Sequence, residues 1–420
     1  MNGLPVAYQM RAAIDADAAA RVALDDIVWA GDGGGPADVR EAGSRPRGAL
    51  VVEYDGDIVG ACGSRELLLG LPGPLGGVRA VAVEGLTQVG VHPDHSRRGV
   101  LRAMVGSHLE WTRASGRTLA VLKASEPGIY GRFGYGMASV AALTSFPAGT
   151  KWTAPQGIVD LAEATHTAMA TAEPEHAERL YAVWSACANV HLGMVVRSDE
   201  DIARLTRGVP ELRVGKEPRR LMFATREGVD VGFAWFRRDG AWSAGRPAGT
   251  VDVTWFAGVD QGARLALMRR LVDLDLVTSV VNWVAPDDPL VTWLGSPRAL
   301  DARTTDSVWL RIADLPAAVA ERGYAAPCDL RIEVRDHVIP ANDGVWRVVA
   351  DATGIGRAER TDGAPDLTLD IADLGACWLG GQTIGARAEA GFVVEHRPGA
   401  VLALDAALRT LTLPAQAADF

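Results

Sequence analysis

Residues 89–102 read VGVHPDHSRRGVLR, and residues 125–136 read SEPGIYGRFGYG. The first stretch begins as an apolar run typical of a β-strand, passes through a polar loop, and enters an amphipathic helix expected over 98–114. The second stretch follows the next expected strand, residues 119–122, and combines closely spaced glycines with two tyrosines. These two neighbouring strand–loop junctions decide the fold assignment.

The loop of the first stretch has the composition of an anion-binding site. Arg97, Arg98 and Arg102 surround Gly99 at the start of the expected helix. The first N–H groups of a helix lack intrahelical acceptors and carry partial positive charge, which favours phosphate groups. Gly99 lets the backbone approach a ligand closely, and arginines add charge and donors. The stretch therefore indicates pyrophosphate binding; an ordinary strand–helix junction with solvated arginines is the alternative.

The expected elements occur twice in the same order along the chain. In the first half a hairpin closes on Asp55-Gly56, a strong type I′ turn signal, and a strand, a helix and a strand follow. The second half repeats this order around the turn Glu227-Gly228. The segments are 49–63, 84–91, 98–114 and 119–122, then 221–237, 251–256, 261–274 and 277–284. The pattern predicts a tandem repeat of one fold, whose second copy lacks the arginine-rich turn.

The chain from about residue 305 has a different pattern. A strand and a helix are followed by three segments that alternate like antiparallel strands, and then by helical spacing. These segments are 308–312, 315–322, 330–334, 345–350, 367–371 and 372–411. An earlier break, Phe146–Gly157, is rich in proline and glycine. We therefore predict three α+β domains, with boundaries at residues 1–150, 151–304 and 305–420.

Length and charge narrow the classes of function. The 420 residues exceed one ordinary domain of about 100–200 residues. The chain has 42 basic and 52 acidic side chains, a formal charge of −10. This balance argues against a nucleic-acid partner, which needs a basic surface. It suits a protein that collects cationic small molecules, because a negative field raises their local concentration.

Metal and membrane signals are absent from the sequence. The four cysteines lie far apart without a CxxC pair, so we expect neither a zinc site nor a disulfide framework. His92 and His95 are close in sequence, but two loop histidines are a better interpretation than a metal site. No stretch approaches the roughly 18 apolar residues of a membrane span, and the N-terminus lacks a signal-peptide core. We expect no metal, no membrane partner and a cytoplasmic location.

The two stretches carry a resemblance to a known family. VGVHPDHSRRGVLR resembles the acyl-CoA signature of the GNAT N-acetyltransferases, with two departures: Ser96 replaces Arg or Gln, and Leu101 replaces Gly or Ala. Together with GIYGRFGYG it resembles the Eis (enhanced intracellular survival) acetyltransferases, as do residues 306–325 and the terminal Ala-Asp-Phe. The resemblance implies tandem GNAT folds, the second degenerate, with mixed central sheets flanked by helices. It also implies a C-terminal sterol-carrier-protein-like α+β domain.

The resemblance also assigns roles to individual residues. Tyr130 matches the family's general acid, and the C-terminal carboxylate of Phe420 matches its general base. Three segments match the family's acetyl-CoA site. The resemblance implies that strand residues 89–91 face the pantetheine arm and that turn residues 97–102 wrap the pyrophosphate. It also implies that residues 125–126 line the far side of the coenzyme. These residues are Val89, Gly90, Val91, Arg97, Arg98, Gly99, Val100, Leu101, Arg102, Ser125 and Glu126.

The implied chemistry suits these residue types. An alkyl amine titrates near ~10, so it must lose a proton before it attacks a thioester at neutral pH. A carboxylate can accept that proton, and a phenol can protonate the leaving thiolate. A terminal carboxylate has a reference pKa of about 3.5 and needs burial to act as a base. We interpret Tyr135 as a packing residue and Asp419 as added negative charge. Asp25, Asp26 and Asp32 are further candidates for a substrate channel, although an ordinary solvated carboxylate is the better interpretation of each.

The leading hypothesis is an acetyl-CoA-dependent N-acetyltransferase that acts on cationic amines such as aminoglycosides. The first alternative is an acetyltransferase for protein lysines or polyamines. The second is a carrier of an apolar ligand in which the GNAT domain is vestigial. The resemblance alone implies a homo-hexamer.

Overall fold

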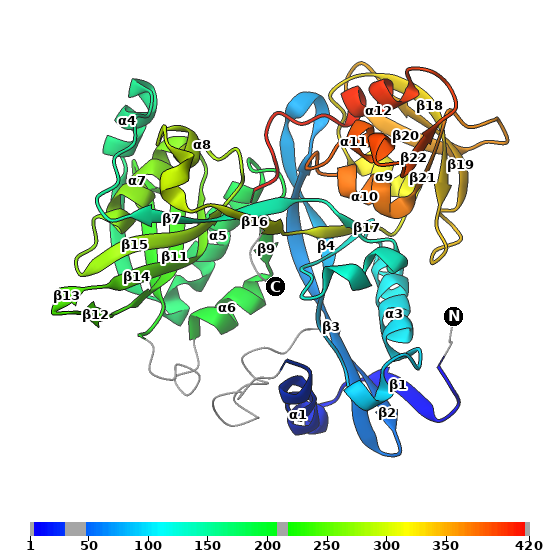
Figure 1. Cartoon of the computed structure of the whole chain (residues 1–420), viewed down its shortest axis with the longest axis horizontal. Coiled ribbons are helices and arrows are strands. Elements are labelled where there is room, and N and C mark those ends of the chain that lie inside the picture. The colour runs from blue at the N-terminus through cyan, green and yellow to red at the C-terminus, as the bar shows by residue number, and fades with distance from the viewer. Residues whose placement is uncertain (1–3, 30–47, 208–216, 416–420) are drawn as a thin grey trace.

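The computed structural model describes residues 4–29, 48–207 and 217–415. Two mixed sheets lie side by side, and a third, smaller α+β unit packs beside the first sheet (Figure 1). Within the described residues the sheets contain eight, seven and five strands, apart from a two-stranded hairpin. The long strands β3 (Asp57–Pro72) and β4 (Val78–Val91) run through the middle of the molecule and contact all three units.

The first sheet contains the elements predicted for the first repeat. The turn between β2 and β3 has positive φ at Asp55 (52°) and Gly56 (88°), as a type I′ turn requires. Helix α3 buries Met104, Val105 and Leu109 against the sheet, so the predicted apolar face is confirmed. The other elements are β1 (Tyr8–Ala12), α1 (Ala18–Trp29), β2 (Leu50–Tyr54), α3 (Val100–Ala114), β5 (Leu119–Leu122) and β6 (Gly136–Met137).

The second sheet confirms the predicted repeat. Its hairpin turn again has positive φ at Glu227 (52°) and Gly228 (78°). The repeat consists of β10 (Arg220–Arg226), β11 (Val229–Asp239), β14 (Gly249–Gly258), α7 (Gln261–Val272) and β15 (Val277–Val284). Flanking it are α4 (Gln156–Glu163), β8 (His166–Thr171), α5 (Ala177–Ala188), α6 (Asp199–Arg207), the hairpin β12 (Trp242–Ser243) and β13 (Arg246–Pro247), and α8 (Pro289–Thr292).

The two repeats exchange strands, which the sequence pattern does not predict. Strand β7 (Val140–Pro147) follows the first repeat but lies in the second sheet, between β15 and β16 (Arg303–Asp306). Strand β17 (Trp309–Ile312) follows the second repeat but lies in the first sheet, between β5 and β6. A third crossing strand, β9 (Val195–Arg197), pairs with β3. Each sheet therefore needs both halves of the chain, whereas the predicted boundaries at residues 150 and 304 stay predictions.

The third unit places five strands beside short helices. One prediction was wrong here: β21 (Leu367–Asp370) runs parallel to β18 (Cys328–Arg335), whereas β18 and β19 are antiparallel as expected. The alternation of buried and exposed residues is the same in both arrangements, so the pattern did not reveal the direction. The remaining elements are α9 (Leu315–Glu321), β19 (Gly344–Ala350), β20 (Gly356–Arg360), α10 (Ile371–Cys377), α11 (Ile384–Glu389), β22 (Val393–Glu395) and α12 (Ala400–Leu408).

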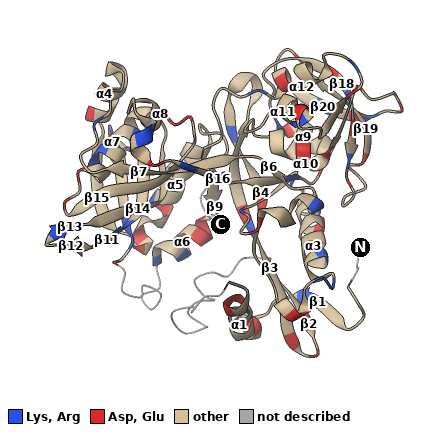
Figure 2. Ribbon diagram, viewed as in Figure 1, with Lys and Arg blue, Asp and Glu red and all other residues tan. Residues whose placement is uncertain are grey.

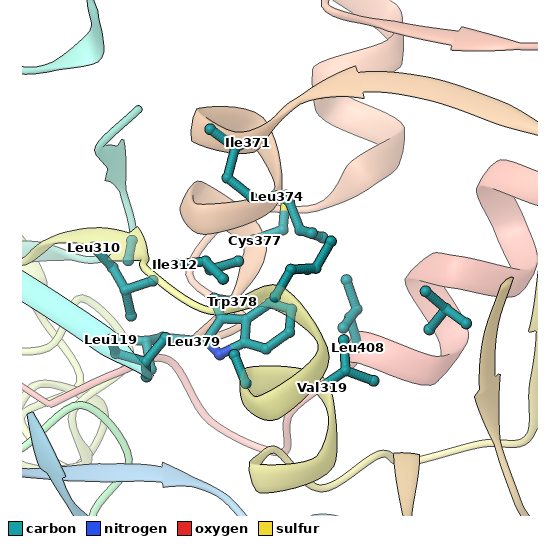
Figure 3. Close-up of a cluster of buried hydrophobic side chains, with 14 of the residues drawn as sticks. Leu119, Leu310, Ile312, Val319, Ile371, Leu374, Cys377, Trp378, Leu379 and Leu408 are labelled. Carbon is teal, nitrogen blue, oxygen red and sulfur yellow. The ribbon is translucent and has the colours of Figure 1, made fainter. Parts of the chain in front are cut away.

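The third unit shares its core with the first sheet. Figure 3 shows Trp378 beside Leu119 and Leu310 of the first sheet and Leu408 of α12. A buried ion pair also joins the units: Arg311 of β17 donates to both carboxylate oxygens of Asp336 at 2.7 Å, and both side chains are fully inaccessible. The third unit therefore anchors the first sheet.

Candidate active site

Strands β4 and β5 diverge and leave a gap in the first sheet. They are parallel and pair at only two points, Glu84 with Ala120 and Gly85 with Val121. Beyond Gly85, β4 continues to Val91 without β5 beside it, while its other edge stays paired with β3. The register with β3 shifts in this segment, and Gln88 has a positive φ of 50°, which marks a bulge. Backbone groups on the open edge of β4 are thus available to a ligand.

The arginine turn joins the end of β4 to helix α3. Arg97 and Gly99 have positive φ values of 63° and 88°, and Gly99 caps the helix without a side-chain hydrogen bond. The first helical bond runs from the Ala103 N–H to the Gly99 carbonyl at 3.0 Å. The N–H groups of the first helical turn therefore have no intrahelical acceptor, and they suit an anion. Figure 2 shows basic positions along α3 and acidic positions on α1.

Arg98 is oriented by a residue that the sequence analysis missed. Its guanidinium donates to the Tyr8 hydroxyl at 3.2 Å, and that hydroxyl lies 2.9 Å from Nδ1 of His95. The Tyr54 and His95 rings pack 4.9 Å apart beneath this chain of contacts. Tyr8 lies about 90 residues before Arg98, and no sequence motif marked it.

A groove of about 830 Å³ contains most of the predicted coenzyme residues together with Tyr130. Two predicted residues do not line this groove: Gly90 is buried under Val28 of α1, and Ser125 is exposed. The predicted residues that line it are Val89, Val91, Arg97, Arg98, Gly99, Val100, Leu101, Arg102, Glu126 and Tyr130. Six further lining residues were missed, Val28, His95, Ser96, Ile129, Arg132 and Phe133, although the last five lie within or beside the quoted stretches.

Tyr130 is held at the wall of this groove by its own backbone. Its carbonyl accepts the N–H of Phe133 at 3.0 Å and of Tyr135 at 3.3 Å. Burial raises the pKa of the Tyr130 phenol to about 12, with smaller contributions from Cys62 and Glu126. Tyr135, 6.0 Å away between ring centres, is fully buried, and its hydroxyl has no hydrogen-bond partner among the described residues. Of the two phenols, Tyr130 alone lines the groove.

In the second repeat, the corresponding helix end is occupied by protein groups. Asp260 caps α7 by accepting the Ala263 N–H at 2.9 Å, and it forms an ion pair with Arg226. Leu161 of α4 packs so closely on Gly262 that a Cβ there would lie 2.3 Å from it. Strands β14 and β15 pair along five positions, and β14 continues beyond Val253 without β15 beside it, so these strands separate as well. Protein groups therefore occupy the position at this end of α7 that is open at the start of α3.

Comparisons with known proteins agree with this arrangement. Models of the acetyltransferase (GNAT) domain match residues 31–138 and 193–312, and a sterol carrier protein domain model matches residues 315–416. An uncharacterised N-acetyltransferase of Streptomyces coelicolor is 36% identical over 383 residues, 86% of each chain. The N-acetyltransferase Eis of Mycobacterium bovis is 30% identical over 389 residues, 89% of each chain. The chain belongs to the Eis family of N-acetyltransferases.

Solved structures place the fold within the same family. Eis1 from Mycobacterium abscessus has a TM-score of 0.80 at 29% identity, covering 98% of this chain and 100% of that chain. A GCN5-related N-acetyltransferase from Anabaena variabilis has a TM-score of 0.82 at 15% identity, with the same coverage, and shares the fold. The predicted tandem GNAT folds with a sterol-carrier-protein-like domain are confirmed, and the protein is an N-acetyltransferase.

The last described residues of this Eis family member return to the junction of the first two sheets. The Leu413 N–H donates to Asp287 at 2.8 Å, and the Ala415 N–H donates to the Leu192 carbonyl at 2.6 Å. Ala415 packs on the cluster that contains Trp255. The predicted base, Phe420, lies outside the described residues, and so do Asp419 and Asp32.

Other predicted features of the site have simple structural settings. Asp25 and Asp26 are half-buried on α1, the helix that contributes Val28 to the groove. His92 and His95 pack edge to face with ring centres 5.8 Å apart, and the described residues contain no group of three metal-binding side chains. Among the same residues, no helix is both long and apolar enough to cross a bilayer.

Proposed function

We propose that this protein is an acetyl-CoA-dependent N-acetyltransferase that acts on amines of cationic substrates such as aminoglycosides. The observation that carries the proposal is the single groove in which the open helix end, its arginines and the Tyr130 phenol meet. The second repeat offers a filled helix end in the corresponding position, so we place the acetyl donor in the first repeat alone.

The residues of the groove fit the chemistry of acetyl-CoA. Its pyrophosphate needs donors and positive charge, which the first turn of α3 and the exposed Arg97 and Arg102 supply. Its amide-containing pantetheine arm needs backbone partners, which the unpaired edge of β4 at Val89–Val91 supplies. The bound donor supplies an acetyl group activated as a thioester.

The chain's own groups would move the protons of the reaction. The acceptor nitrogen forms a bond to the acetyl carbon while the carbon–sulfur bond breaks. We propose that Tyr130 gives its phenolic proton to the departing sulfur, because its raised pKa keeps it protonated at neutral pH. A backbone N–H of the Val89–Val91 segment would stabilise the negative oxygen that develops on the carbonyl. By the family resemblance, the Phe420 carboxylate would take the proton from the amine.

Charge supports a cationic acceptor. The chain carries a formal charge of −10, and Glu126 lines the groove beside Tyr130. A negative field concentrates polycations near the site, and neighbouring charges on a polycation lower the pKa of each of its amines. Protein lysines and polyamines share this chemistry and remain the alternative acceptors. Comparing kcat/KM for an aminoglycoside, a polyamine and a lysine peptide separates the three classes.

Among the described residues, the apolar core of the third unit is continuous with that of the first sheet, and Trp378 (1% exposed) is buried within it. A core filled by protein side chains does not favour the carrier alternative. We also propose a homo-hexamer on the resemblance alone. From the charge balance and the lack of long apolar stretches in the sequence, we propose a cytoplasmic location and neither a nucleic-acid nor a membrane partner. Light scattering of the purified protein tests the hexamer.

The proposed function is tested by thiol release from acetyl-CoA in the presence of kanamycin-like amines. Because general acids typically contribute about 10²–10⁴-fold, Tyr130→Phe should lose at least about a hundredfold in kcat. Tyr135→Phe is the matched control and should keep near-normal kcat, since its hydroxyl has no partner in the described structure. Deletion of Phe420 should also remove most of the rate. Near-normal turnover in Tyr130→Phe or in the deletion variant would show that the acid or the base is wrongly assigned.

A further inference from the structure

A second groove opens next to the groove that contains Tyr130. It has a volume of about 480 Å³ and lies between one face of α3 and the loop 337–340 of the third unit. The two grooves share Arg102, Arg132 and Phe133, so they adjoin at the start of α3. The new groove is lined by Arg102, Gly106, Leu109, Glu110, Arg113, Arg132, Phe133, His337, Val338, Ile339 and Pro340.

The lining of this groove combines an apolar floor with positive charge. Leu109, Phe133 and Ile339 are buried and supply the apolar part. Arg102, Arg113 and Arg132 are exposed, and none of them forms an ion pair with another described residue. Glu110 is the one carboxylate in the lining. Such a surface suits a ligand that has both a flat apolar ring and a phosphate.

The loop that forms the far wall is held in place independently of any ligand. The buried Asp336 carboxylate accepts the N–H groups of Val338 at 3.0 Å and Ile339 at 2.9 Å. Asn342 donates to the same carboxylate at 3.0 Å and also bonds the Ile339 carbonyl through its backbone N–H. Because Arg311 of the first sheet binds Asp336 on both oxygens, the loop has a fixed position relative to α3. A preformed wall of this kind lowers the cost of ordering a ligand.

We propose that this groove binds the 3′-phosphoadenosine end of the acetyl donor. The inference rests on the proposed function, which places the pyrophosphate at Arg97–Arg102 and the sulfur near Tyr130. The remaining part of the molecule, an adenine on a ribose 3′-phosphate, then continues past Arg102 into the adjoining groove. The adenine lies against Phe133 and Ile339, and the 3′-phosphate faces Arg132 and Arg113.

This assignment gives the third unit a direct part in binding the acetyl donor. A sterol carrier protein domain model matches that unit, but its loop 337–340 completes a wall that the first repeat lacks. Arg132 comes from the glycine–tyrosine string, Arg113 from the last turn of α3, and His337 from the third unit. Selection for the 3′-phosphate would therefore depend on residues that lie outside the arginine turn.

The test compares the binding of coenzyme A and dephospho-coenzyme A, which lacks the 3′-phosphate, to the full-length protein by calorimetry. Hydrogen bonds between charged groups are stronger than those between neutral groups. We therefore expect wild type to bind coenzyme A at least about tenfold more tightly than dephospho-coenzyme A. The double variant Arg113→Gln/Arg132→Gln should bring the two dissociation constants close to each other by weakening coenzyme A much more than dephospho-coenzyme A. Arg270→Gln is the matched control, because it removes an exposed cation from the last turn of α7, the helix equivalent to α3.

The possible outcomes separate this inference from the proposed function. Equal affinity of wild type for the two ligands, or an unchanged preference in the double variant, would show that the second groove does not bind the 3′-phosphate. Either result would leave the acetyltransferase assignment intact. No binding of either ligand would overturn both. A preference that the double variant loses and Arg270→Gln keeps supports the inference.

Discussion

Tyr130 combines exposure to the groove with a nearly complete burial of its ring. Burial raises its pKa to about 12, so the phenol keeps its proton throughout the neutral and mildly alkaline range. We therefore expect that deprotonation of the general acid does not lower kcat between pH 7 and about pH 10. The measurement is kcat at saturating acetyl-CoA and amine across that range. A fall with an apparent pKa near 9 that is absent from the residual activity of Tyr130→Phe would show that Tyr130 is the acid but that its pKa is not raised.

His108 offers a second prediction at the scale of single residues. It is 2% exposed within α3, neither ring nitrogen has a partner in the described structure, and burial lowers its pKa to about 4. Because the unfolded chain binds a proton near pH 6.5 and the folded chain does not, folding becomes less favourable as the pH falls from 6.5 towards 4.

The variant His108→Leu removes both the unsatisfied nitrogens and this titration. We expect the free energy of unfolding of His108→Leu to exceed that of wild type. This excess should be about 2 kcal/mol larger at pH 5 than at pH 7.5. Urea unfolding of both proteins at the two pH values measures this difference. A difference independent of pH would show that folding does not lower the pKa of His108.

At this scale the sequence predicted residues that belong to contiguous motifs. The arginine turn, Glu126 and Tyr130 all line one groove, as the two quoted stretches indicated. Val28 and the loop 337–340 were missed because they reach the grooves through tertiary packing from distant elements, and Tyr8 was missed because it reaches Arg98 in the same way. Nothing in their local sequence distinguishes them from other strand, helix and loop residues.

Glycines in the string at 128–136 have two different structural roles. A Cβ at Gly136 would lie 2.0 Å from the Ala372 carbonyl oxygen of α10, whereas a Cβ at Gly131 would have nothing within 4 Å. We expect Gly136→Ala to destabilise the protein by about 3 kcal/mol or more by forcing α10 away from the first sheet. Gly131→Ala is the matched control and should stay close to wild type. Thermal unfolding of both variants measures the effect, and equal stability would contradict the close packing.

Element order was predictable because local signals specify hairpins and amphipathic helices. Both Asp55-Gly56 and Glu227-Gly228 form the expected turns, and α3 and α7 follow the expected strands. The exchange of β7 and β17 and the parallel direction of β21 were not predictable. Strand pairing depends on which edges remain open after folding, and the period of a strand carries no information about its partner.

Across the whole molecule, the Arg311–Asp336 pair connects the first sheet to the third unit. Removing one partner of a fully buried ion pair typically costs about 3–5 kcal/mol, because the remaining charge is left uncompensated. Arg311→Met should therefore lower the free energy of unfolding by that amount and loosen the loop 337–340. Denaturant unfolding measures the first effect, and hydrogen exchange at Val338 and Ile339 measures the second. Wild-type stability together with unchanged exchange would show that the pair does not anchor the third unit.

We propose that only the first of the two repeats binds the acetyl donor. The first repeat has an open helix end beside diverging strands, and the second has a helix end filled by Asp260 and covered by α4. Titration calorimetry of the full-length protein with acetyl-CoA tests this claim most directly. We predict one molecule bound per chain and loss of binding in Gly99→Val, whose side chain would be strained at a φ of 88°. Two molecules per chain, or none, would show that the first repeat is not the one binding site for the acetyl donor.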